Sequence, residues 1–344
     1  MIQTAIVGYG KSAKYFHVPL LKTAPGFKVT SVMQRTKDDS LTDFPDARLV
    51  RDMSTLLEDD KLDLVVITSP NAVHFQQTYD ALMAGKHVVV EKPFTVTSTE
   101  AEQLTDLAKQ QNRILTIFQN RRWDGDFYTV KNIIESGRLG NIVEYEAAWN
   151  RFRNRLRDDA WKEKELPGSG ILYDLSPHLI DQTLLLFGSP TAVFADVRSQ
   201  RGGDADDRFD LTLYYPGIKV LLRAGMLVPE ATARFIIRGT QGTFIKYGLD
   251  PQEEALAAGL LPDAPGWGLE PEENWGMLHL ENDGNIYVER VKTLPGNYPG
   301  FYEELREAIE SKGEVPVLPE TGTLIIRIIE KAIESNNKRE AVKL

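Results

Sequence analysis

The chain begins with the pattern of a strand, a glycine turn and a helix. Thr-Ala-Ile-Val at residues 4–7 is followed by Gly8 and Gly10, and Ala13 opens an apolar helical pattern. This spacing matches G-x-G-x-x-G/A, in which the glycines allow a tight turn and the approach of a pyrophosphate, and the small third residue allows close helix–strand packing. Helix N-termini also favour anions. We therefore expect a dinucleotide site with Gly8, Tyr9, Gly10 and Ala13 at the cofactor, although a purely structural turn would show the same spacing.

Apolar runs and helical patterns alternate after this turn as far as residue 120. Strands are expected at residues 28–34, 62–68, 87–90 and 114–118. Helices are expected at residues 72–84 and after the capping-box sequence at residues 97–100. Strands that alternate with helices form a parallel, doubly wound sheet. Because 344 residues exceed a comfortable single core, we expect residues 1–120 to form a Rossmann domain and residues 121–344 a second domain.

The end of the second expected strand carries a cation where a dinucleotide site usually has an acid. Residues 29–33 lead into Gln34, Arg35 and Thr36. An Asp or Glu at this place bonds the ribose 2′-hydroxyl of NAD, whereas an arginine accommodates the 2′-phosphate of NADP. Arg35 and Thr36 therefore predict NADP(H) in preference to NAD(H). The alternative is that Arg35 is only a solvated loop residue.

The strand at residues 88–90 ends in Glu91, Lys92 and Pro93. Proline cannot continue a strand ladder, and it pushes the preceding residue toward an extended conformation. Lys92 is then presented at the carboxyl end of a strand, where ligands lie in open α/β sheets. This lysine is the first candidate for a catalytic residue.

A second loop is expected to line the same crevice. Thr68, Pro70 and Asn71 follow a buried strand and open the next helix, so they bring small polar groups to the cofactor. His74 lies one turn into that helix and is a further candidate contact, although a lone histidine is more often a packing or capping residue.

From residue 121 onward the expected strands are joined by tight turns. Turn sequences occur at Pro216-Gly217, Gln241-Gly242 and Asp283-Gly284. Hairpins of this kind form antiparallel sheets, so the second domain is expected to be α+β. Strands are expected at residues 142–150, 191–199, 208–215, 218–226, 233–238 and 243–247. Helices are expected at residues 126–136, 300–311 and 319–335, the last packing back toward the first domain, with a surface loop at residues 259–276.

Residues 168–178 carry the second candidate for chemistry. Proline is tolerated only in the first turn of a helix, so Pro177 predicts a helix start near Asp174. Asp174 and His178 are then four residues apart on one helix face, where a carboxylate can orient an imidazole. The helix dipole would also favour a neutral, proton-accepting histidine. A capping aspartate and a packed histidine are the alternative.

Composition excludes several other classes of protein. The absence of cysteine rules out disulfides and thiolate metal sites and fits a reducing cytoplasm. A formal charge of −10 disfavours non-specific nucleic-acid binding. There is no run of about 18 apolar residues that would indicate a membrane span, and the start lacks a signal-peptide pattern. We expect a cytoplasmic protein with no bound metal and with neither nucleic acid nor membrane as a partner.

Three motifs, in this order and separation, resemble a known family. Gly8-Tyr9-Gly10, Glu91-Lys92-Pro93 and Asp174-x-x-x-His178 resemble the pattern of the glucose–fructose oxidoreductase and inositol dehydrogenase family (Gfo/Idh/MocA), and the resemblance covers essentially the whole chain. The combination is specific, whereas each motif singly is not.

A narrower resemblance rests on other residues. Tyr15-Phe16-His17-x-Pro19, Asn120-Arg121-Arg122-Trp123-Asp124 and the loop of Arg35 are similar to the NADP-dependent scyllo-inositol 2-dehydrogenase branch of that family. Ala13 in place of the third glycine is a permitted departure. The missing acidic residue at the strand end puts NAD use in doubt.

The resemblance implies a C-terminal domain with a large open antiparallel sheet and homodimers or homotetramers built through it. It also implies reversible oxidation of a ring hydroxyl to a ketone, between scyllo-inositol and scyllo-inosose in the narrower branch. In the family's pattern Lys92, Asp174 and His178 form the catalytic triad. Cofactor contacts are implied at Gly8, Gly10, Arg35, Thr68, Pro70, Asn71, His74, Glu91 and Lys92, with Asn120, Trp161 and Lys162 near the nicotinamide. Substrate contacts are expected at Lys92, Asn150, Arg151, Asp174 and His178.

His178, Asp174 and Lys92 can carry out such an oxidation, and two alternative functions remain. His178 would accept the hydroxyl proton as hydride leaves, Asp174 would steady the imidazolium, and Lys92 would stabilise alkoxide character on the oxygen. The first alternative is a dehydrogenase or reductase of an aldose, a sugar acid or a sugar phosphate, because the four arginines at positions 151, 153, 155 and 157 include candidates for binding an anion. A solvated loop, a subunit contact or a lid would also explain them. The second alternative is a non-catalytic NADP-binding sensor, against which the three catalytic positions weigh.

Overall fold

The computed structural model describes residues 1–157 and 161–344, with Trp161 described by its backbone alone. In that part of the chain two compact units form. The first unit contains Met1–Asn120, Gln252–Trp267 and Asn297–Ile326. The second unit contains Arg121–Pro251, Gly268–Gly296 and Arg327–Leu344. Two later segments therefore belong to the first unit, and the last helix contributes residues to both.

The first unit is built on a six-stranded parallel sheet with the order β3-β2-β1-β4-β5-β6, which confirms the expected Rossmann-like fold class. The strand order reverses between β1 and β4, and the carboxyl ends at such a reversal are where ligands bind in sheets of this type. The residues Leu-Val-Val-Ile of β4 are all fully buried, as expected for a strand covered on both faces. The strands are β1 (Ile2–Val7), β2 (Phe27–Met33), β3 (Arg48–Val50), β4 (Leu64–Ile67), β5 (His87–Val90) and β6 (Leu115–Ile117).

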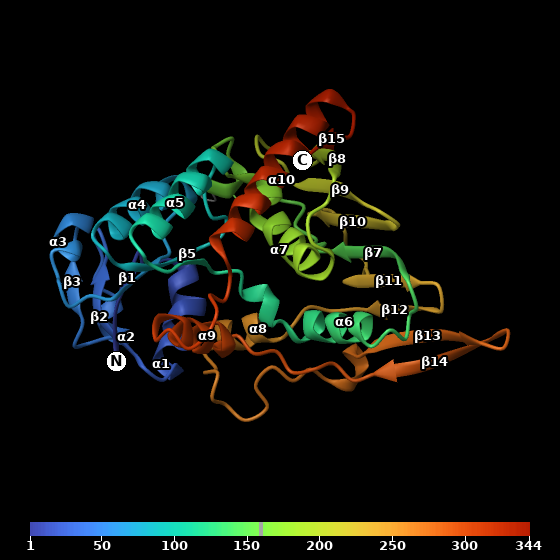
Figure 1. Ribbon diagram of the computed structural model, residues 1–344, viewed down its shortest axis with the longest axis horizontal. Coiled ribbons are helices and arrows are strands. Elements are labelled where there is room, and N and C mark those ends of the chain that lie inside the picture. Colours follow the sequence, from blue (N-terminus) through green and yellow to red (C-terminus); the bar gives the residue numbers. More distant parts are fainter. Residues whose placement is uncertain (158–160) are drawn as a thin grey trace. The chain divides into compact units, whose positions relative to one another are not determined.

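Helices α4 (His74–Met83) and α5 (Ser98–Gln110) pack side by side in the first unit (Figure 1). The expected capping box begins α5, because the Thr97 side chain accepts from the Glu100 N–H and the Glu100 carboxylate accepts from the Thr97 N–H. The helix after the glycine turn opens with a π-helical turn, η1 (Ala13–His17). The other helices of this unit are α1 (Val18–Thr23), α2 (Ser40–Asp43), α3 (Met53–Leu57), η2 (Asn71–Val73), α8 (Gln252–Ala257) and α9 (Pro299–Ile309).

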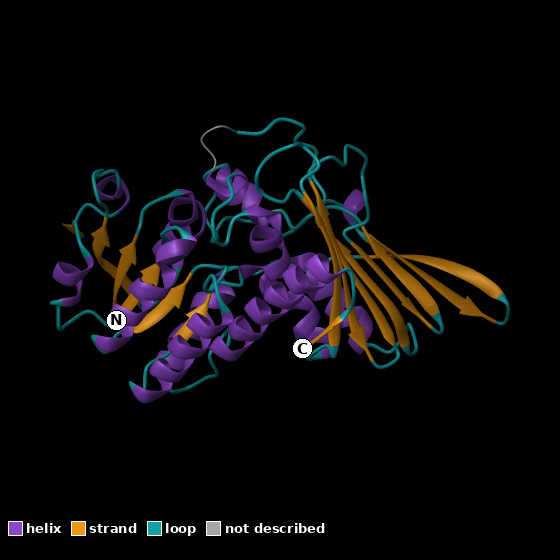
Figure 2. Ribbon diagram, turned by 90° about the horizontal axis from the view of Figure 1, so that it is seen from above, coloured by secondary structure: helices purple, strands orange, loops and turns teal. Residues whose placement is uncertain are grey.

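The second unit is built on a nine-stranded sheet with the order β14-β13-β12-β11-β7-β10-β9-β8-β15 (Figure 2). The sheet is mostly antiparallel, which confirms the expected α+β class of this part of the chain; one pair is parallel, because β7 lies between β10 and β11 and runs parallel to β10. Turn sequences fix only strands that are neighbours in the chain, whereas β7 enters from a distant segment. The strands are β7 (Ile142–Ala148), β8 (Ala192–Arg198), β9 (Arg208–Tyr215), β10 (Ile218–Gly225), β11 (Phe235–Gly239), β12 (Gly242–Lys246), β13 (Gly276–Asn282), β14 (Asn285–Val291) and β15 (Val342–Lys343).

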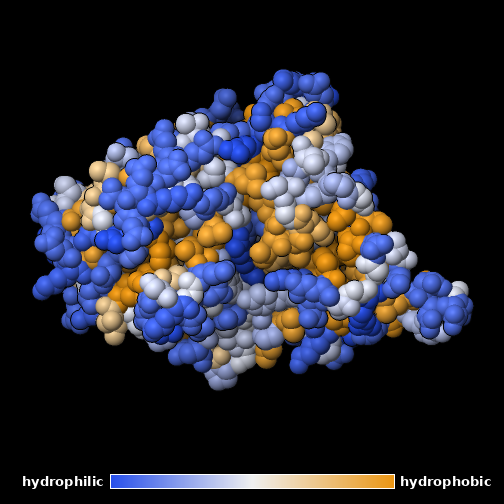
Figure 3. Space-filling view, in the orientation of Figure 1, coloured by the Kyte–Doolittle hydropathy of each residue, from blue (hydrophilic) through white to orange (hydrophobic). Residues whose placement is uncertain are grey.

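Helix α7 (Gly170–Phe187) packs against β9 and β10 on one face of this sheet. Its last residue, Phe187, meets the buried Tyr145 of β7 edge to face, with ring centroids 5.4 Å apart. Leu185, near the end of α7, is exposed, and Figure 3 shows that apolar and polar residues are interspersed on the face of the molecule that it draws. The other helices lie in the second unit or, for η3 and α10, have residues in both units. They are η3 (Asn120–Trp123), α6 (Gly125–Glu135), η4 (Trp161–Glu163), η5 (Glu272–Asn274) and α10 (Pro319–Lys338).

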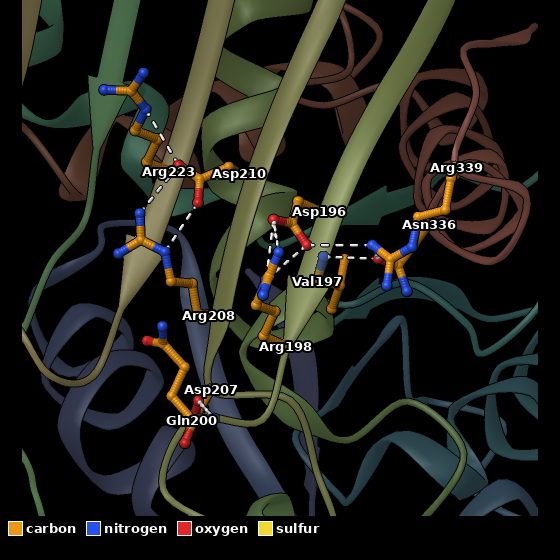
Figure 4. Close-up of polar contacts among 10 residues, drawn as sticks. All are labelled: Asp196, Val197, Arg198, Gln200, Asp207, Arg208, Asp210, Arg223, Asn336 and Arg339. Carbon is orange, nitrogen blue, oxygen red and sulfur yellow. Dashed lines mark hydrogen bonds and ion pairs between the residues drawn. The ribbon is translucent and has the colours of Figure 1, made fainter.

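The opposite face of the sheet carries rows of paired charges. Arg223 reaches Asp210 at 3.2 Å and Glu146 at 3.3 Å, and Arg208 reaches Asp210 at 2.9 Å. Figure 4 shows the first and last of these pairs and a second group in which Asp196 binds Arg198 and Arg339. Alternation along β7, β9 and β10 produces this arrangement, because their buried apolar residues face α7 and their charged residues face outward.

Three elements differ from the sequence-based expectations. The region at residues 259–276 includes the short helix η5, and the helix α8 just before it was not expected. The chain also ends in the short strand β15, which pairs with β8. None of the helices in the described ranges is both long and apolar enough to cross a bilayer. The same ranges contain no cluster of three or more histidine and acidic side chains suited to a metal ion.

Candidate functional site

The glycine turn is shaped by a close approach of two backbones. Gly8 has a φ of +88°, and a Cβ at this position would lie 3.0 Å from the Ser69 nitrogen. The Thr68 hydroxyl fixes the approach, because it donates to the Gly8 carbonyl at 2.9 Å. A Cβ at Gly10 would meet no atom of the described residues within 4 Å. The open space beside Gly10 and the fully buried Ala13 therefore fit a turn that leaves its backbone accessible to a ligand.

The side chain of Tyr9 points to an acid on a neighbouring helix. Its hydroxyl donates to the Asp43 carboxylate at 2.5 Å, and Asp43 also binds Lys22 at 2.6 Å. Burial and the neighbouring carboxylate raise the pKa of Tyr9 far above its ordinary value. The phenol is thus a protonated anchor for the turn, and its backbone is the part available to a cofactor.

The loop after β2 is ordered by hydrogen bonds that leave its predicted phosphate-binding residues exposed. The Gln34 amide donates to Asp39 at 2.6 Å, and Gln34 accepts from the Ser40 N–H at 3.1 Å. Arg35 and Thr36 lie between these partners and are exposed. The sequence interpretation missed Arg51, whose guanidinium donates to the Gln34 carbonyl at 3.0 Å. Arg51 could have been found from its position directly after β3. Parallel neighbouring strands end at the same edge of a sheet, so a residue that follows β3 lies near the residues that follow β2.

His74 is fully buried between two backbone segments. Its Nδ1 lies 2.9 Å from the Pro93 carbonyl and its Nε2 lies 2.9 Å from the Ser69 carbonyl. Burial lowers the pKa of His74, so the ring is neutral and donates to one of these oxygens at a time. The ring therefore links the loop that carries Pro70 and Asn71 to the Lys92–Pro93 segment.

Glu91 is buried and ionised beside Lys92. Its carboxylate accepts from the Ser12 hydroxyl, from the Lys92 N–H at 3.1 Å, and from His17 Nε2 at 3.1 Å. Burial by itself would raise the pKa of Glu91, but the bonds from His17 and Ser12 and the charge of Lys92 outweigh it and hold that pKa below its ordinary value. The sequence interpretation assigned Glu91 and Lys92 to the site but gave His17 no role in it.

Asp174 and His178 lie on α7, which belongs to the second unit. The helix begins at Gly170 and contains Pro177 in its interior, so the expected start near Asp174 was wrong. Ser169 holds the N-cap position, which excludes Asp174 as the cap. His178 is then more than two turns from the helix start, where the dipole has faded, so the dipole does not account for a neutral ring. The two side chains still share a helix face because they are four residues apart.

Asp174 meets one of the residues assigned to the cofactor. Lys162, on η4, donates to the Asp174 carboxylate at 2.6 Å. Trp161 precedes it on the same short helix, and the side chain of Trp161 lies outside the described residues. The structure thus joins two positions that the sequence had placed in separate roles.

The ring of His178 packs against Trp149, with centroids 5.6 Å apart. Guanidinium groups of Arg121, Arg151 and Arg234 lie within 5.5 Å of the same indole ring. Trp149 was not identified from the sequence, although it directly follows β7 and directly precedes Asn150 and Arg151. His178 is therefore buried beside an aromatic plane that is surrounded by cations.

The other predicted residues of this region are held by internal contacts. The Asn150 amide donates to the Thr232 hydroxyl at 3.1 Å. Arg157 pairs with Glu163 at 3.2 Å, and the carbonyls of Arg153 and Arg155 accept from Arg201 at 3.1 Å and 3.3 Å.

In the first unit, the side-chain nitrogen of Asn120 is buried and has no hydrogen-bond partner among the described residues. Such an orphaned donor calls for a ligand or a water.

Asp206 holds the first turn of α7. Its carboxylate accepts from the Leu172 N–H at 2.7 Å, and a Cβ at Gly170 would lie 1.9 Å from a carboxylate oxygen. Gly170 also has a φ of +78°, so a side chain there is excluded by conformation as well as by space. The carboxylate therefore fixes the start of the helix that carries Asp174 and His178.

Replacing Asp206 by asparagine is expected to change the pH dependence of stability. Burial raises the pKa of Asp206 to about 6, so the folded state favours its protonated form. The stability that this group contributes is complete below its unfolded pKa and is lost as the pH rises through about 6. An asparagine keeps an acceptor for Leu172 but does not ionise. Between pH 4 and pH 8 the wild-type protein should therefore lose at most about 3 kcal/mol relative to the variant, measured by urea unfolding at both pH values.

Lys92 belongs to the first unit, whereas Asp174, His178 and Lys162 belong to the second. The structure thus groups the predicted residues into a cofactor set around the glycine turn, Glu91 and Lys92, and a second set on α7. Each set is locally ordered by the contacts described above.

Comparison with known proteins covers the whole length of the chain. Residues 2–119 match the family model described as "Oxidoreductase family, NAD-binding Rossmann fold", and residues 131–344 match "Oxidoreductase family, C-terminal alpha/beta domain", the two Gfo/Idh/MocA models. The chain is 39% identical over 344 residues to scyllo-inositol 2-dehydrogenase (NADP(+)) IolW of Bacillus subtilis (strain 168), covering 100% of this chain and 96% of that protein. It is 40% identical to the uncharacterized oxidoreductase YdgJ of Escherichia coli (strain K12), covering 100% and 99%.

The fold is also similar to solved structures. A structure of yvaA from Bacillus subtilis, described as an oxidoreductase, superposes with a TM-score of 0.95 at 37% identity and covers 100% of both chains. Similarity of this extent includes both sheets and the segments that carry the candidate residues.

Proposed function

Because the chain belongs to the Gfo/Idh/MocA oxidoreductase family, we propose that it is an NADP(H)-dependent enzyme that interconverts a ring hydroxyl and a ketone of a cyclitol. The substrate pair that we propose is scyllo-inositol and scyllo-inosose. The observation that carries this proposal is the full-length identity of 39% to a relative named for that reaction. The resemblance of the Glu91-Lys92-Pro93 and Asp174-x-x-x-His178 motifs to the family's pattern supports it.

The glycine turn and its neighbours fit a dinucleotide. The space beside Gly10 is open, the Asn120 amide is a buried donor without a partner among the described residues, and Arg35 is exposed at the end of β2. Arg35 and Thr36 would hold the 2′-phosphate, and Thr68, Pro70 and Asn71 would line the cofactor. When bound, the nicotinamide would supply the acceptor or donor of hydride.

The chain's own residues would handle the proton and the developing charge. We assign His178 as the base that accepts the hydroxyl proton, and Asp174 as the carboxylate that steadies the resulting imidazolium. Lys92 would donate a hydrogen bond to the substrate oxygen and stabilise its alkoxide character. Lys162 moderates the charge of Asp174 through their hydrogen bond at 2.6 Å, and Asn150 and Arg151 are assigned to the substrate.

The direct test is a substrate panel with both cofactors. The purified protein would be mixed with NADP⁺ or NAD⁺ and with scyllo-inositol, myo-inositol, aldoses, sugar acids and sugar phosphates, and absorbance at the NADPH band would be followed. Turnover of the cyclitols with NADP⁺ is expected. A preference for a sugar phosphate would support the alternative in which an arginine of residues 151–157 binds an anion, and tight NADPH binding without turnover of any substrate would support a sensor.

Replacing Arg35 by aspartate is expected to reverse the cofactor preference. The change removes the cation proposed for the 2′-phosphate and supplies the acid that bonds a ribose 2′-hydroxyl. We expect kcat/KM for NADP⁺ to fall about 100-fold and that for NAD⁺ to stay equal or rise, which steady-state kinetics with each cofactor would measure. Arg48→Asp is the matched control, because Arg48 is an exposed arginine on neighbouring strand β3 and has no proposed contact with the cofactor. An unchanged NADP⁺ preference in Arg35→Asp would exclude the assignment.

We also propose that the protein forms homodimers or homotetramers through its nine-stranded sheet. The outward face of that sheet carries paired charges, among them Arg223 with Asp210, which Figure 4 shows, and Arg223 with Glu146. Light scattering in low and high salt would measure the assembly and its dependence on these charges.

A further inference from the structure

Lys92 is flanked by two buried histidines that belong to the same unit. His74 binds the carbonyl of Pro93 on one side of the lysine, as described above. On the other side, His17 binds Glu91, the residue that directly precedes Lys92. Both histidine rings are fully buried, so neither can reach a substrate directly, and each contacts the chain at a residue adjacent to Lys92.

The contacts of His17 extend to the C-terminal part of the chain. Its Nε2 lies 3.1 Å from the Glu91 carboxylate and its Nδ1 lies 2.7 Å from the Tyr302 hydroxyl on α9. The imidazole also packs on Phe118, with ring centroids 4.1 Å apart. Because an ionised carboxylate only accepts, Nε2 must carry a proton and donate to Glu91. The Tyr302 hydroxyl can donate to Nδ1 of a neutral His17 ring or accept from Nδ1 of an imidazolium. The hydrogen bonds of His17 to Tyr302 and Glu91 can therefore form whether the ring is neutral or charged.

Glu91 joins this chain to the glycine turn and to the lysine. One carboxylate oxygen accepts from both His17 and the Ser12 hydroxyl, and the other accepts from the Lys92 N–H at 3.1 Å. Ser12 directly follows Gly10 and Lys11 in the turn proposed to bind the pyrophosphate. A single buried carboxylate therefore holds the backbone of Lys92 in register with the cofactor turn.

We propose that Tyr302, His17 and Glu91 form a positioning chain that fixes Lys92 relative to the cofactor turn and keeps a negative charge next to its amine. This inference rests on the proposed catalytic role of Lys92 and adds three residues that act through it. A carboxylate without His17 would be a buried charge that had lost one of its donors, and it would be free to take another rotamer or a proton. The tyrosine restrains the imidazole in turn, because it binds the nitrogen that does not face Glu91.

The titratable groups that act on Glu91 or respond to its charge lie on separate segments of the first unit. They are His17 on η1, Lys92 and His74 on the flanking segments, and Tyr302 on α9. Burial and the charge of Glu91 keep the pKa of Tyr302 well above its ordinary value, so its hydroxyl remains protonated across the working range. The amine of Lys92 interacts with the charge of Glu91, so its proton affinity should fall when that charge is removed.

The first test is Glu91→Gln, which keeps the shape of the side chain and removes its charge. We expect kcat to fall about 10- to 100-fold with a smaller change in KM for the substrate, as for other residues that orient a catalytic group. The pH at which Lys92 reacts with trace acetic anhydride, read by peptide mass spectrometry, should fall by about one unit because the neighbouring charge is gone. A kcat within twofold of wild type together with an unchanged reactivity profile of Lys92 would overturn the proposal.

The second test separates the links of the chain. His17→Gln can still donate to Glu91 and is expected to lose less turnover than His17→Ala, while Tyr302→Phe should lose about as much as His17→Gln. If the three residues act in series, Tyr302→Phe will cost less in the Glu91→Gln background than in the wild type. Additive losses would instead indicate independent structural roles and would contradict the series. Should His17→Ala fail to fold, the Glu91→Gln and Tyr302→Phe cycle decides the question alone.

A control variant and an activity-independent readout complete the design. Thr78→Val removes a buried hydroxyl from α4 in the same unit, and that hydroxyl has no hydrogen-bond partner among the described residues. It should leave turnover and Lys92 reactivity at wild-type values. If the wild type turned over no substrate of the panel, the proposed function would fail, but the acetylation profile of Lys92 would still decide whether Glu91 and His17 position the lysine.

Discussion

Alanine at position 178 is expected to lower kcat about 10²- to 10⁴-fold, because a single general base contributes that much to rate. His178 is buried beside Trp149, and the variant removes the imidazole that we assign as the base. Lys92→Ala should cause a loss of similar size by removing the donor to the alkoxide oxygen. Stopped-flow measurement of NADPH formation with the cyclitol that reacts best would give kcat for each variant.

The binding of NADPH separates loss of chemistry from loss of fold. Fluorescence titration should give dissociation constants for NADPH close to that of the wild type in His178→Ala. Lys28→Ala, at an exposed lysine on β2, is the matched control for Lys92→Ala and should retain full turnover. Wild-type kcat in both His178→Ala and Lys92→Ala would remove these residues from the mechanism.

The largest expected effect on stability comes from a buried ion pair beneath the nine-stranded sheet. Lys246 is fully buried, lies 3.0 Å from the Glu270 carboxylate and donates to the Tyr247 carbonyl at 2.6 Å. Lys246→Met would leave Glu270 as a buried charge without its cation. Loss of one partner of such a pair costs about 3–5 kcal/mol. Urea unfolding followed by circular dichroism at pH 7 would measure this loss.

The stability that Lys246→Met loses relative to the wild type is expected to increase with pH. Burial already raises the pKa of Glu270 above its ordinary value, although Lys246 opposes the rise, so removing the lysine should raise this pKa further. A raised pKa in the folded state gives stability that is complete below the unfolded pKa and is lost as the pH rises through the folded value. Lys246→Met should therefore be closest to the wild type near pH 4 and furthest from it near pH 8.

Two further variants test the cause. Lys246→Met combined with Glu270→Leu replaces the pair by apolar side chains and should recover most of the lost stability. Lys331→Met breaks a half-exposed ion pair with Glu334 in the same unit and should have much less effect on unfolding than Lys246→Met. If the double variant were as unstable as Lys246→Met, the lost stability would have to come from packing and not from the uncompensated carboxylate.

The sequence was sufficient for features that depend on neighbours in the chain. The strand, glycine turn and helix at residues 4–21 predicted the Rossmann-like class, because the spacing of Gly8, Gly10 and Ala13 is a local pattern. Hairpins at Pro216-Gly217 and Asp283-Gly284 were confirmed for the same reason. Chain position also made Glu91 and Lys92 candidates, since a proline ends the strand directly after them.

Features that depend on residues far apart in the chain were decided by the tertiary structure. The partners of His17 are 74 and 285 residues away, so no local pattern could pair that ring with Glu91 and Tyr302. The start of α7 was misjudged because a local rule for Pro177 was overridden by the packing of a buried helix against the sheet. The parallel pairing of β7 with β10 likewise joins distant segments. Local sequence thus determined which side chains could do chemistry, whereas long-range packing decided which groups hold them, because hydrogen bonds and burial act through space and not along the chain.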